Sequence, residues 1–230
     1  MEVSDLHTYY GKSHVLQGCT VTVEQGCVAV LGRNGMGKTT LLRSVMGLTP
    51  PRSGSVQWRG EEISRKKPFA IASMGIGYVP QGRRLFPSLS VEEHLTLTYR
   101  PKRTANQWTP QRVYDIFPEL AQRRKLSGSR LSGGEQQMLA MGRALVTNPS
   151  LILLDEPSEG LAPIAIERIV ETCRELRKAN ISILLVEQNI HVAAAFAERI
   201  YVLLSGVTVY ESGAKAFLEN PDLRQKYLGL

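Results

Sequence analysis

The decapeptide LGRNGMGKTT, residues 31–40, is the feature that most restricts the possible fold. Its glycines, lysine and threonine have the spacing G-x-x-x-x-G-K-[ST], the pattern of a phosphate-binding loop. Residues 27–32 form a short apolar run that indicates a strand, and residues 40–48 carry apolar side chains at helical spacing. A strand, a glycine-rich turn and a helix in this order predict the start of an α/β core of the P-loop type.

The side chains of this loop predict the chemistry of a triphosphate site. Gly35 and Gly37 can adopt positive φ, which lets successive backbone N–H groups turn toward an anion. The positive end of the following helix would point at the same phosphates. Lys38 supplies a charge toward the β- and γ-phosphates, and the Thr39 hydroxyl supplies an oxygen ligand for Mg²⁺.

An apolar strand that ends in two carboxylates, LILLDEP at residues 151–157, predicts the hydrolytic part of the site. Its end lies at the carboxyl edge of a parallel sheet, where ligands bind in such folds. Asp155 is predicted to orient Mg²⁺ and its waters, and Glu156 to polarise the attacking water. Adjacent acids at a strand end more often form a plain turn, but after a phosphate loop they indicate hydrolysis.

Two further motifs complete the pattern. In LSGGEQQ, residues 131–137, Ser132 and Glu135 have capping-box spacing around Gly133 and Gly134, which predicts a second helix end able to bind an anion. Gln81 follows a short strand predicted at residues 76–79. Each motif alone is weak, since a capped helix and a lone glutamine are common.

Composition limits the class of protein. The chain has 230 residues, 43% hydrophobic, which predicts one globular domain or one domain with an inserted subdomain. Its three cysteines have no zinc-like or paired spacing, and no apolar run is long enough to span a membrane. The net charge of +7 fits nucleic acid, anionic lipid, nucleotide phosphate or simply a solvated basic surface.

The pattern along the chain predicts two parts within a single domain, residues 1–230. Early alternating strands and a hairpin near Arg59 and Gly60 predict an antiparallel β-subdomain, so that core and β-subdomain cover about 1–85 and 150–230. Capping residues at Ser90 and Thr109 predict a helical subdomain of about 86–149. Its basic residues are interpreted as part of a surface loop: Arg100, Lys102, Arg103 and Arg112.

In this order the motifs resemble the ATP-binding cassette family over essentially the whole chain. The resemblance implies that residues 32–39 are the Walker A loop, residues 131–137 the signature and residues 151–156 the Walker B strand with the catalytic Glu156. It implies that Gln81 senses the γ-phosphate, contributes to the magnesium site and couples to a membrane partner. The nucleotide-binding residues implied are Tyr10, Asn34, Gly35, Gly37, Lys38, Thr39, Thr40, Gln81, Ser132, Gly133, Gly134 and Glu135.

Two features of this family bear on partners and on adenine. Tyr10 is the best match for the aromatic residue that stacks on adenine, with Tyr9 as the alternative. A purely structural role, with Tyr10 packed on the sheet, is the other interpretation. Cassettes of the family dimerise head to tail, so that each signature caps the ATP held by the other chain. The γ-phosphate then biases a two-state assembly.

A closer resemblance narrows the substrate class. The segments YVPQGRRLFPSLSVEEHL, LSGGEQQMLAMGRAL and DEPSEGLAP look like the smaller ATPase subunit of bacterial importers for branched-chain amino acids, amides and urea. GRNG and GYVPQGR look somewhat closer to the urea and amide branch. The partners implied are a second ATPase in a heterodimer, with a homodimer left open, two permease subunits and a periplasmic binding protein. The implied place is the cytoplasmic face of the inner membrane.

Two positions depart from the wider family. Gln188 stands where most cassettes place a histidine after the second acidic strand, and Ala162 stands where an aspartate is usual. A glutamine amide can hydrogen-bond a γ-phosphate but cannot carry a proton as imidazole does. We therefore expect Gln188 to act by hydrogen bonding, and His191 to face solvent or core.

Two other classes stay open as alternatives. A nucleic-acid-linked cassette would suit the basic charge, but the chain has no heptad array, no zinc spacing and no second cassette. A non-transport assembly role or an exporter ATPase is the other alternative. We expect no nucleic-acid partner.

Overall fold

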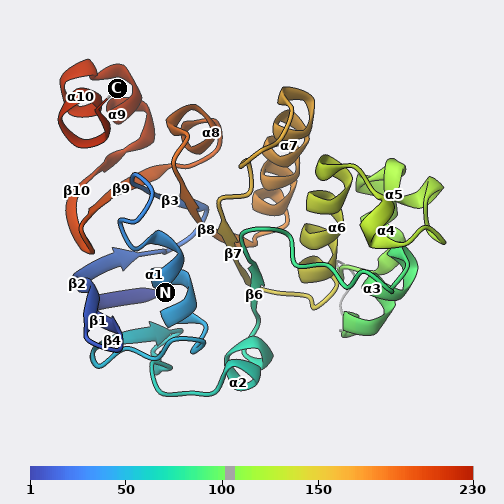
Figure 1. Cartoon of the computed structure of the whole chain (residues 1–230), viewed down its shortest axis with the longest axis horizontal. Coiled ribbons are helices and arrows are strands. Elements are labelled where there is room, and N and C mark those ends of the chain that lie inside the picture. The colour runs from blue at the N-terminus through green and yellow to red at the C-terminus, as the bar shows by residue number, and fades with distance from the viewer. Residues whose placement is uncertain (102–106, 230) are drawn as a thin grey trace.

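The computed structural model describes residues 1–101 and 107–229, so Lys102 and Arg103 of the predicted surface loop lie outside the described residues. Within the described residues, the strands form two β-sheets, and helices pack around them (Figure 1). The larger sheet has the order β10-β9-β3-β8-β7-β6. Its strands are β3 (Cys27–Leu31), β6 (Ile76–Val79), β7 (Leu151–Asp155), β8 (Ser182–Glu187), β9 (Arg199–Leu204) and β10 (Val207–Gly213).

The strand β3 is the centre of this larger sheet. It pairs in parallel with β8 on one side and β9 on the other, and β7 and β6 continue the parallel order. Only β10 is antiparallel, on β9. Every residue of β3 is buried because alternate side chains enter two separate hydrophobic clusters. A strand covered on both faces reads as the continuous apolar run seen in the sequence.

The smaller sheet is antiparallel and has the order β2-β1-β4-β5. It consists of β1 (Glu2–Tyr10), β2 (Ser13–Thr22), β4 (Ser53–Trp58) and β5 (Glu61–Glu62). The hairpin predicted near Arg59 and Gly60 is confirmed, with both residues at positive φ between β4 and β5. The two sheets lie on either side of α1 (Lys38–Val45) (Figure 1).

Helices from the middle of the chain gather beside the larger sheet, away from the smaller one (Figure 1). They are α3 (Val91–Thr98), α4 (Pro110–Ile116), α5 (Pro118–Gln122), a 3₁₀ turn (Gly128–Arg130) and α6 (Gly133–Leu145). The predicted caps are confirmed: Ser90 and Thr109 each accept a backbone N–H three residues on. The division into subdomains at about residues 86 and 149 stays a prediction.

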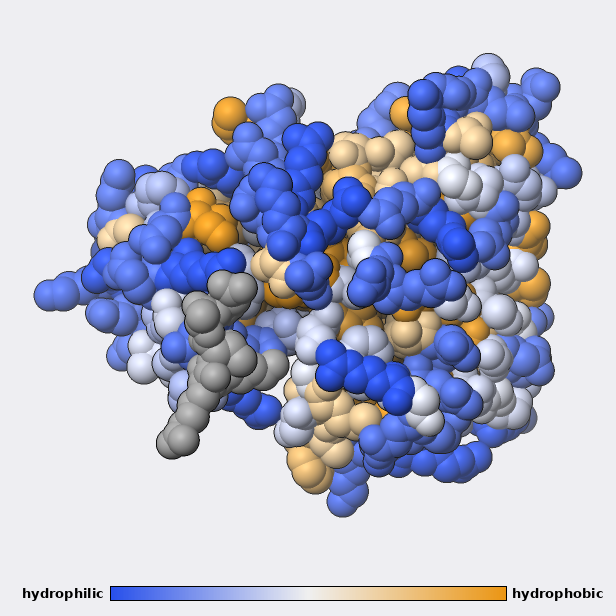
Figure 2. All heavy atoms as spheres, turned by 180° about the vertical axis from the view of Figure 1, so that it is seen from behind, coloured by the Kyte–Doolittle hydropathy of each residue, from blue (hydrophilic) through white to orange (hydrophobic). Residues whose placement is uncertain are grey.

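The remaining helices lie outside this group. They are α2 (Pro68–Ser73), α7 (Pro163–Lys178), α8 (Ile190–Ala194), α9 (Ala214–Glu219) and α10 (Pro221–Leu228). The apolar side chains Ile169, Val170, Cys173 and Leu176 are buried along α7, and all three cysteines are free and buried. Figure 2 shows one face of the molecule as mostly hydrophilic, with small separate hydrophobic spots.

Candidate functional site

The phosphate-loop pattern lies between the end of β3 and the start of α1. Gly37 adopts φ 100° at the N-cap of α1, and a Cβ at this position would come 2.9 Å from the Leu16 side chain. Gly35 also has positive φ, and Asn34 and Gly35 are exposed at the turn. Glycine at these positions keeps the loop's N–H groups and the helix end open to an anion, so the loop fits a phosphate chain.

The Lys38 ammonium lies inside the loop and is only 3% exposed. It donates to the carbonyl oxygens of Gly32 at 2.8 Å and Arg33 at 3.1 Å. It also forms an ion pair with the Glu156 carboxylate, at 2.8 Å between Nζ and Oε1. A single cation therefore connects the phosphate loop to the carboxylate predicted to activate water.

Oxygen ligands suitable for magnesium meet at the end of β7. The Thr39 hydroxyl donates to Asp155 Oδ1 at 2.9 Å, and the Tyr78 hydroxyl donates to Oδ2 at 2.9 Å. Burial raises the pKa of the Asp155 carboxyl above its ordinary value. Thr40 is buried in the same turn of α1. A hydroxyl and a carboxylate beside a phosphate loop fit a hard cation that retains waters and takes oxygens from its nucleotide.

The predicted catalytic residues line one cavity. Glu156 follows β7 with a left-handed backbone (φ 46°), and its N–H donates to the Val186 carbonyl at 2.9 Å. This cavity is lined by Gly32, Glu156, Glu187 and Gln188 among others. An uncommon backbone conformation at a strand end is typical of functional sites. The structure thus brings Glu156 and Gln188 to the same cavity as the phosphate loop.

The Gln81 side chain bonds to two carboxylates in the loop after β7, those of Glu156 and Glu159. Its amide nitrogen donates to Glu159 at 2.8 Å and to Glu156 at 3.4 Å. Gln81 is the residue that joins the loop after β6 to the loop after β7. Its role toward γ-phosphate or magnesium stays a prediction.

The loop that follows Gln81 is held by the helical part of the chain. Arg143 of α6 donates to the carbonyl oxygens of Arg84 at 2.9 Å and Arg83 at 3.3 Å. The Phe86 N–H donates to His94 Nε2 at 2.9 Å, so the other ring nitrogen of His94 carries the proton and donates to the Ser90 carbonyl. His94 is fully buried, and burial lowers the pKa of its imidazole.

Because His94 is buried in its neutral form, we expect the free energy of unfolding to depend on pH. Below about pH 6.5 the unfolded chain takes up a proton on His94, whereas the folded chain resists it down to a lower pH. Arg143 disfavours the charged ring and Glu93 favours it, with burial the larger effect. Between pH 7.5 and 5.5 the free energy of unfolding should therefore fall more in wild type than in His94→Gln. Urea unfolding at both pH values measures this, with the exposed His191→Gln as control. Equal falls in wild type and His94→Gln would contradict it.

Comparison with known proteins shows the family to which the chain belongs. Residues 16–159 match the ABC transporter family. The chain is an ATP-binding cassette of that family. Over 96% of both chains it is 43% identical to BraG of Pseudomonas aeruginosa, a high-affinity branched-chain amino acid transport ATP-binding protein. It is 32% identical to LptB of Escherichia coli, a lipopolysaccharide export ATP-binding protein, over all of this chain and 97% of that one.

A solved cassette has the same fold. A dimeric ATP-binding cassette in a post-hydrolysis state with ADP and phosphate matches with a TM-score of 0.79 and 25% identity, over 93% of this chain and 98% of that one. The predicted α/β P-loop fold with its antiparallel sheet is confirmed. The cassette binds and hydrolyses ATP, and cassettes of this family dimerise and work with transmembrane permease subunits.

The signature of the cassette lies at the start of α6. Ser132 accepts the Glu135 N–H, and the Glu135 carboxylate accepts the Ser132 N–H at 2.8 Å, so the predicted capping box is confirmed. Gly133 and Gly134 form the first turn, where a Cβ on Gly134 would come 2.9 Å from the Cβ of Ala165. The side-chain bonds of Ser132 and Glu135 stay within the helical part of the chain. Contact with the ATP of a second cassette stays a prediction.

The two candidate adenine platforms have different surroundings. Tyr9 stacks on His14 with ring centroids 4.1 Å apart, and the Arg52 guanidinium lies 3.8 Å from the centre of the Tyr9 ring. Tyr10 is 45% exposed, and its hydroxyl lies 3.4 Å from that of Thr49, just beyond α1. An exposed ring near α1 favours Tyr10 over Tyr9, and its contact with adenine stays a prediction.

No prediction from the sequence covered three residues that contact the candidate site or the loops around it. Tyr78 on β6 orients Asp155, Arg143 holds the loop after Gln81, and Glu187 ends β8 beside Gln188. A signal existed only for Glu187, an acid at the end of a buried strand. His191 is exposed and lines the same cavity as Gln188.

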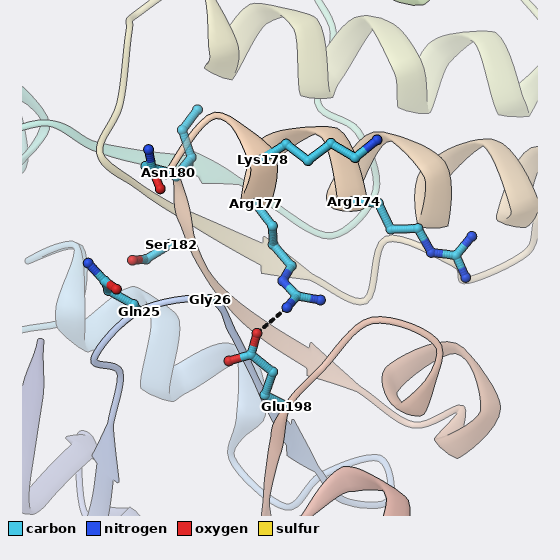
Figure 3. A pocket seen from close by; sticks show the side chains of 9 residues that line it. Gln25, Gly26, Arg174, Arg177, Lys178, Asn180, Ser182 and Glu198 are labelled. Atoms are coloured by element: carbon cyan, nitrogen blue, oxygen red, sulfur yellow. Dashed lines mark hydrogen bonds and ion pairs between the residues drawn. The ribbon is translucent and has the colours of Figure 1, made fainter.

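A second pocket of the cassette lies at the amino ends of β3 and β8 in the larger sheet (Figure 3). Gln25 and Gly26 precede β3 there, and the Arg177 guanidinium pairs with the Glu198 carboxylate. The pocket is therefore remote from the phosphate loop at the carboxyl end of β3.

Across residues 1–101 and 107–229, no helix has both the length and the apolar character required to span a bilayer.

Proposed function

We propose that this cassette is one of two ATPase subunits of a bacterial importer for branched-chain or hydrophobic amino acids, amides or urea. The observation that carries the proposal is the 43% identity to BraG over 96% of both chains. The site supports the ATPase part of this proposal because it contains a phosphate loop, a pair of carboxylates at the end of β7 and a capped signature helix. The proposed place is the cytoplasmic face of the inner membrane, bound to two permease subunits.

A second candidate is an exporter ATPase, favoured by the full-length match to LptB. The identity to that protein, 32%, is lower than the 43% to BraG. The site geometry serves both equally because the ATPase does not contact the cargo. Import is therefore the first candidate.

The test is uptake in the native organism. Deleting the gene should abolish uptake of labelled leucine, acetamide or urea at low concentration, and a wild-type copy should restore it. A Glu156→Gln copy should fail to restore it, since it removes the proposed base. Unchanged uptake of all three, with the tagged chain recovered beside a lipopolysaccharide exporter, would select the second candidate.

We infer a heterodimer with a second, unlike ATPase, which joins this chain to the permeases and a periplasmic binding protein. The isolated subunit should then be largely monomeric and a slow ATPase, because its dimer surface complements an unlike neighbour. Light scattering and a phosphate-release assay measure both properties. Robust cooperative hydrolysis by the isolated chain would instead indicate a homodimer.

The proposed roles within the site follow from its contacts. Thr39, Gln81 and Asp155 would hold Mg²⁺, which neutralises charge on the phosphate oxygens when bound with ATP. Lys38 binds the β- and γ-phosphates, and Glu156 accepts the proton of the attacking water. Gln188, exposed in the cavity that Glu156 also lines, hydrogen-bonds the γ-phosphate.

The role of Gln188 can be measured directly. Gln188→Ala should lower turnover by about ten- to a thousandfold, the range for loss of one polar group that stabilises a transition state. ATP binding should change much less. Gln188→His should stay active and add a pH dependence near the imidazole pKa of about 6.5. Both variants are compared in the assembled transporter, and an unchanged transport rate for Gln188→Ala would leave the residue structural.

A further inference from the structure

The Glu187 carboxylate is buried at the end of β8 and is 2% exposed. It accepts three backbone N–H groups: Ser158 at 3.1 Å on Oε1, and Gln188 at 3.0 Å and Asn189 at 3.2 Å on Oε2. The carboxylate has no cation among its described partners. These backbone N–H groups, together with the Ser158 hydroxyl, thus take the place of a counter-ion.

These donors come from two different loops. Ser158 lies two residues after Glu156, in the loop that leaves β7, whereas Gln188 and Asn189 form the turn between β8 and α8. Both loops line the cavity that holds Glu156. Asn189 in turn caps α8, accepting the N–H groups of His191 and Val192. One carboxylate therefore sets the position of the base-bearing loop relative to the Gln188 backbone.

We propose that Glu187 is a positioning residue for ATP hydrolysis, which joins the loop after Walker B to the Gln188 turn and so aims the Gln188 amide at the γ-phosphate. The inference rests on the catalytic role proposed for Gln188. Two oxygens are required, one for each loop. A glutamine at position 187 has a single acceptor oxygen, so its NH₂ group would face a backbone N–H of one of the loops.

Glu187→Gln should therefore lower kcat by about ten- to a hundredfold, the cost of a displacement of about 1 Å at a reacting centre. KM and the affinity for MgATP should stay within about twofold, since neither loop contact belongs to the phosphate loop. Glu187→Asp, which keeps both acceptor oxygens, should recover part of the lost kcat. These constants are measured in the assembled transporter.

A double-mutant cycle separates positioning from general destabilisation. If Glu187 acts through Gln188, adding Glu187→Gln to Gln188→Ala should lower kcat by less than about twofold further, whereas the losses of two independent residues would multiply. The control is Glu62→Gln in the smaller sheet, an exposed carboxylate whose Oε1 alone accepts two backbone N–H groups, from Val56 and Ser64. This control should keep wild-type kcat.

Several outcomes would overturn the proposal. The losses of the two single variants could multiply in the double variant, or Glu187→Gln could lose MgATP affinity and thermal stability in parallel with kcat. If Glu187→Gln does not fold, the cycle is made with Glu187→Asp and judged by the same rule. If Gln188→Ala alone leaves kcat unchanged, the role of Gln188 and this inference fail together. The importer assignment is judged separately, by uptake.

Discussion

Glu156→Gln should bind ATP at least as tightly as wild type and hydrolyse it about 10²- to 10⁴-fold more slowly, the usual contribution of a positioned general base. The structure gives a reason for retained binding. The Glu156 carboxylate holds the Lys38 ammonium at 2.8 Å, so it competes with phosphate for the same cation. A neutral amide competes less and cannot accept the proton of the water.

Three measurements check this expectation. Calorimetry gives MgATP affinity, and a phosphate-release assay gives turnover. ATP should accumulate in a closed dimer, visible by light scattering when the partner ATPase is present. The control is Glu171→Gln, an exposed carboxylate on α7 that pairs only with Arg168 among the described residues. Normal hydrolysis by Glu156→Gln would remove the residue from the catalytic role.

The parts of the site that lie within single motifs were predictable. A phosphate loop, a capped helix start and a strand ending in Asp155 and Glu156 each have a local signature, because the chemistry acts over a few consecutive residues. Their meeting at one sheet edge follows from parallel strands, whose carboxyl ends lie together. The register confirms it, with Leu31 of β3 opposite Glu187 of β8.

Contacts between distant segments could not be predicted in the same way. The Tyr78 hydroxyl reaches Asp155 across 77 positions, and Arg143 reaches the Arg84 carbonyl across 59. A tyrosine in a strand and an arginine in a helix carry no signal for such partners. The first strand, β1, was not predicted either, because its apolar and polar residues do not alternate strictly. The pairing of β1 with β2 contains register shifts, and these let buried residues such as Val3 and Leu6 lie three positions apart.

Lys38→Ala should lower MgATP affinity by about ten- to a hundredfold. Hydrogen bonds to charged groups contribute about 1.5–3 kcal/mol, and 1.4 kcal/mol corresponds to a tenfold change in affinity. The ammonium already lies inside the loop, with two loop carbonyls and Glu156 around it. Its removal takes away the cation of the phosphate cup and leaves the Glu156 carboxylate without its partner. That carboxylate then repels the γ-phosphate, so the loss of affinity should exceed that of a lysine at the rim of a site.

Calorimetry with MgATP on three variants tests whether the Glu156 charge reaches the γ-phosphate. If Glu156 repels phosphate once Lys38 is absent, the double variant Lys38→Ala with Glu156→Gln should bind more tightly than Lys38→Ala alone. Lys178→Ala, at the exposed end of α7 and the opposite edge of the sheet, is the control and should keep wild-type affinity. Unchanged affinity in Lys38→Ala would refute the assignment of the phosphate loop. Equal affinities for the single and double variants would keep the loop but show that the Glu156 charge does not reach the γ-phosphate.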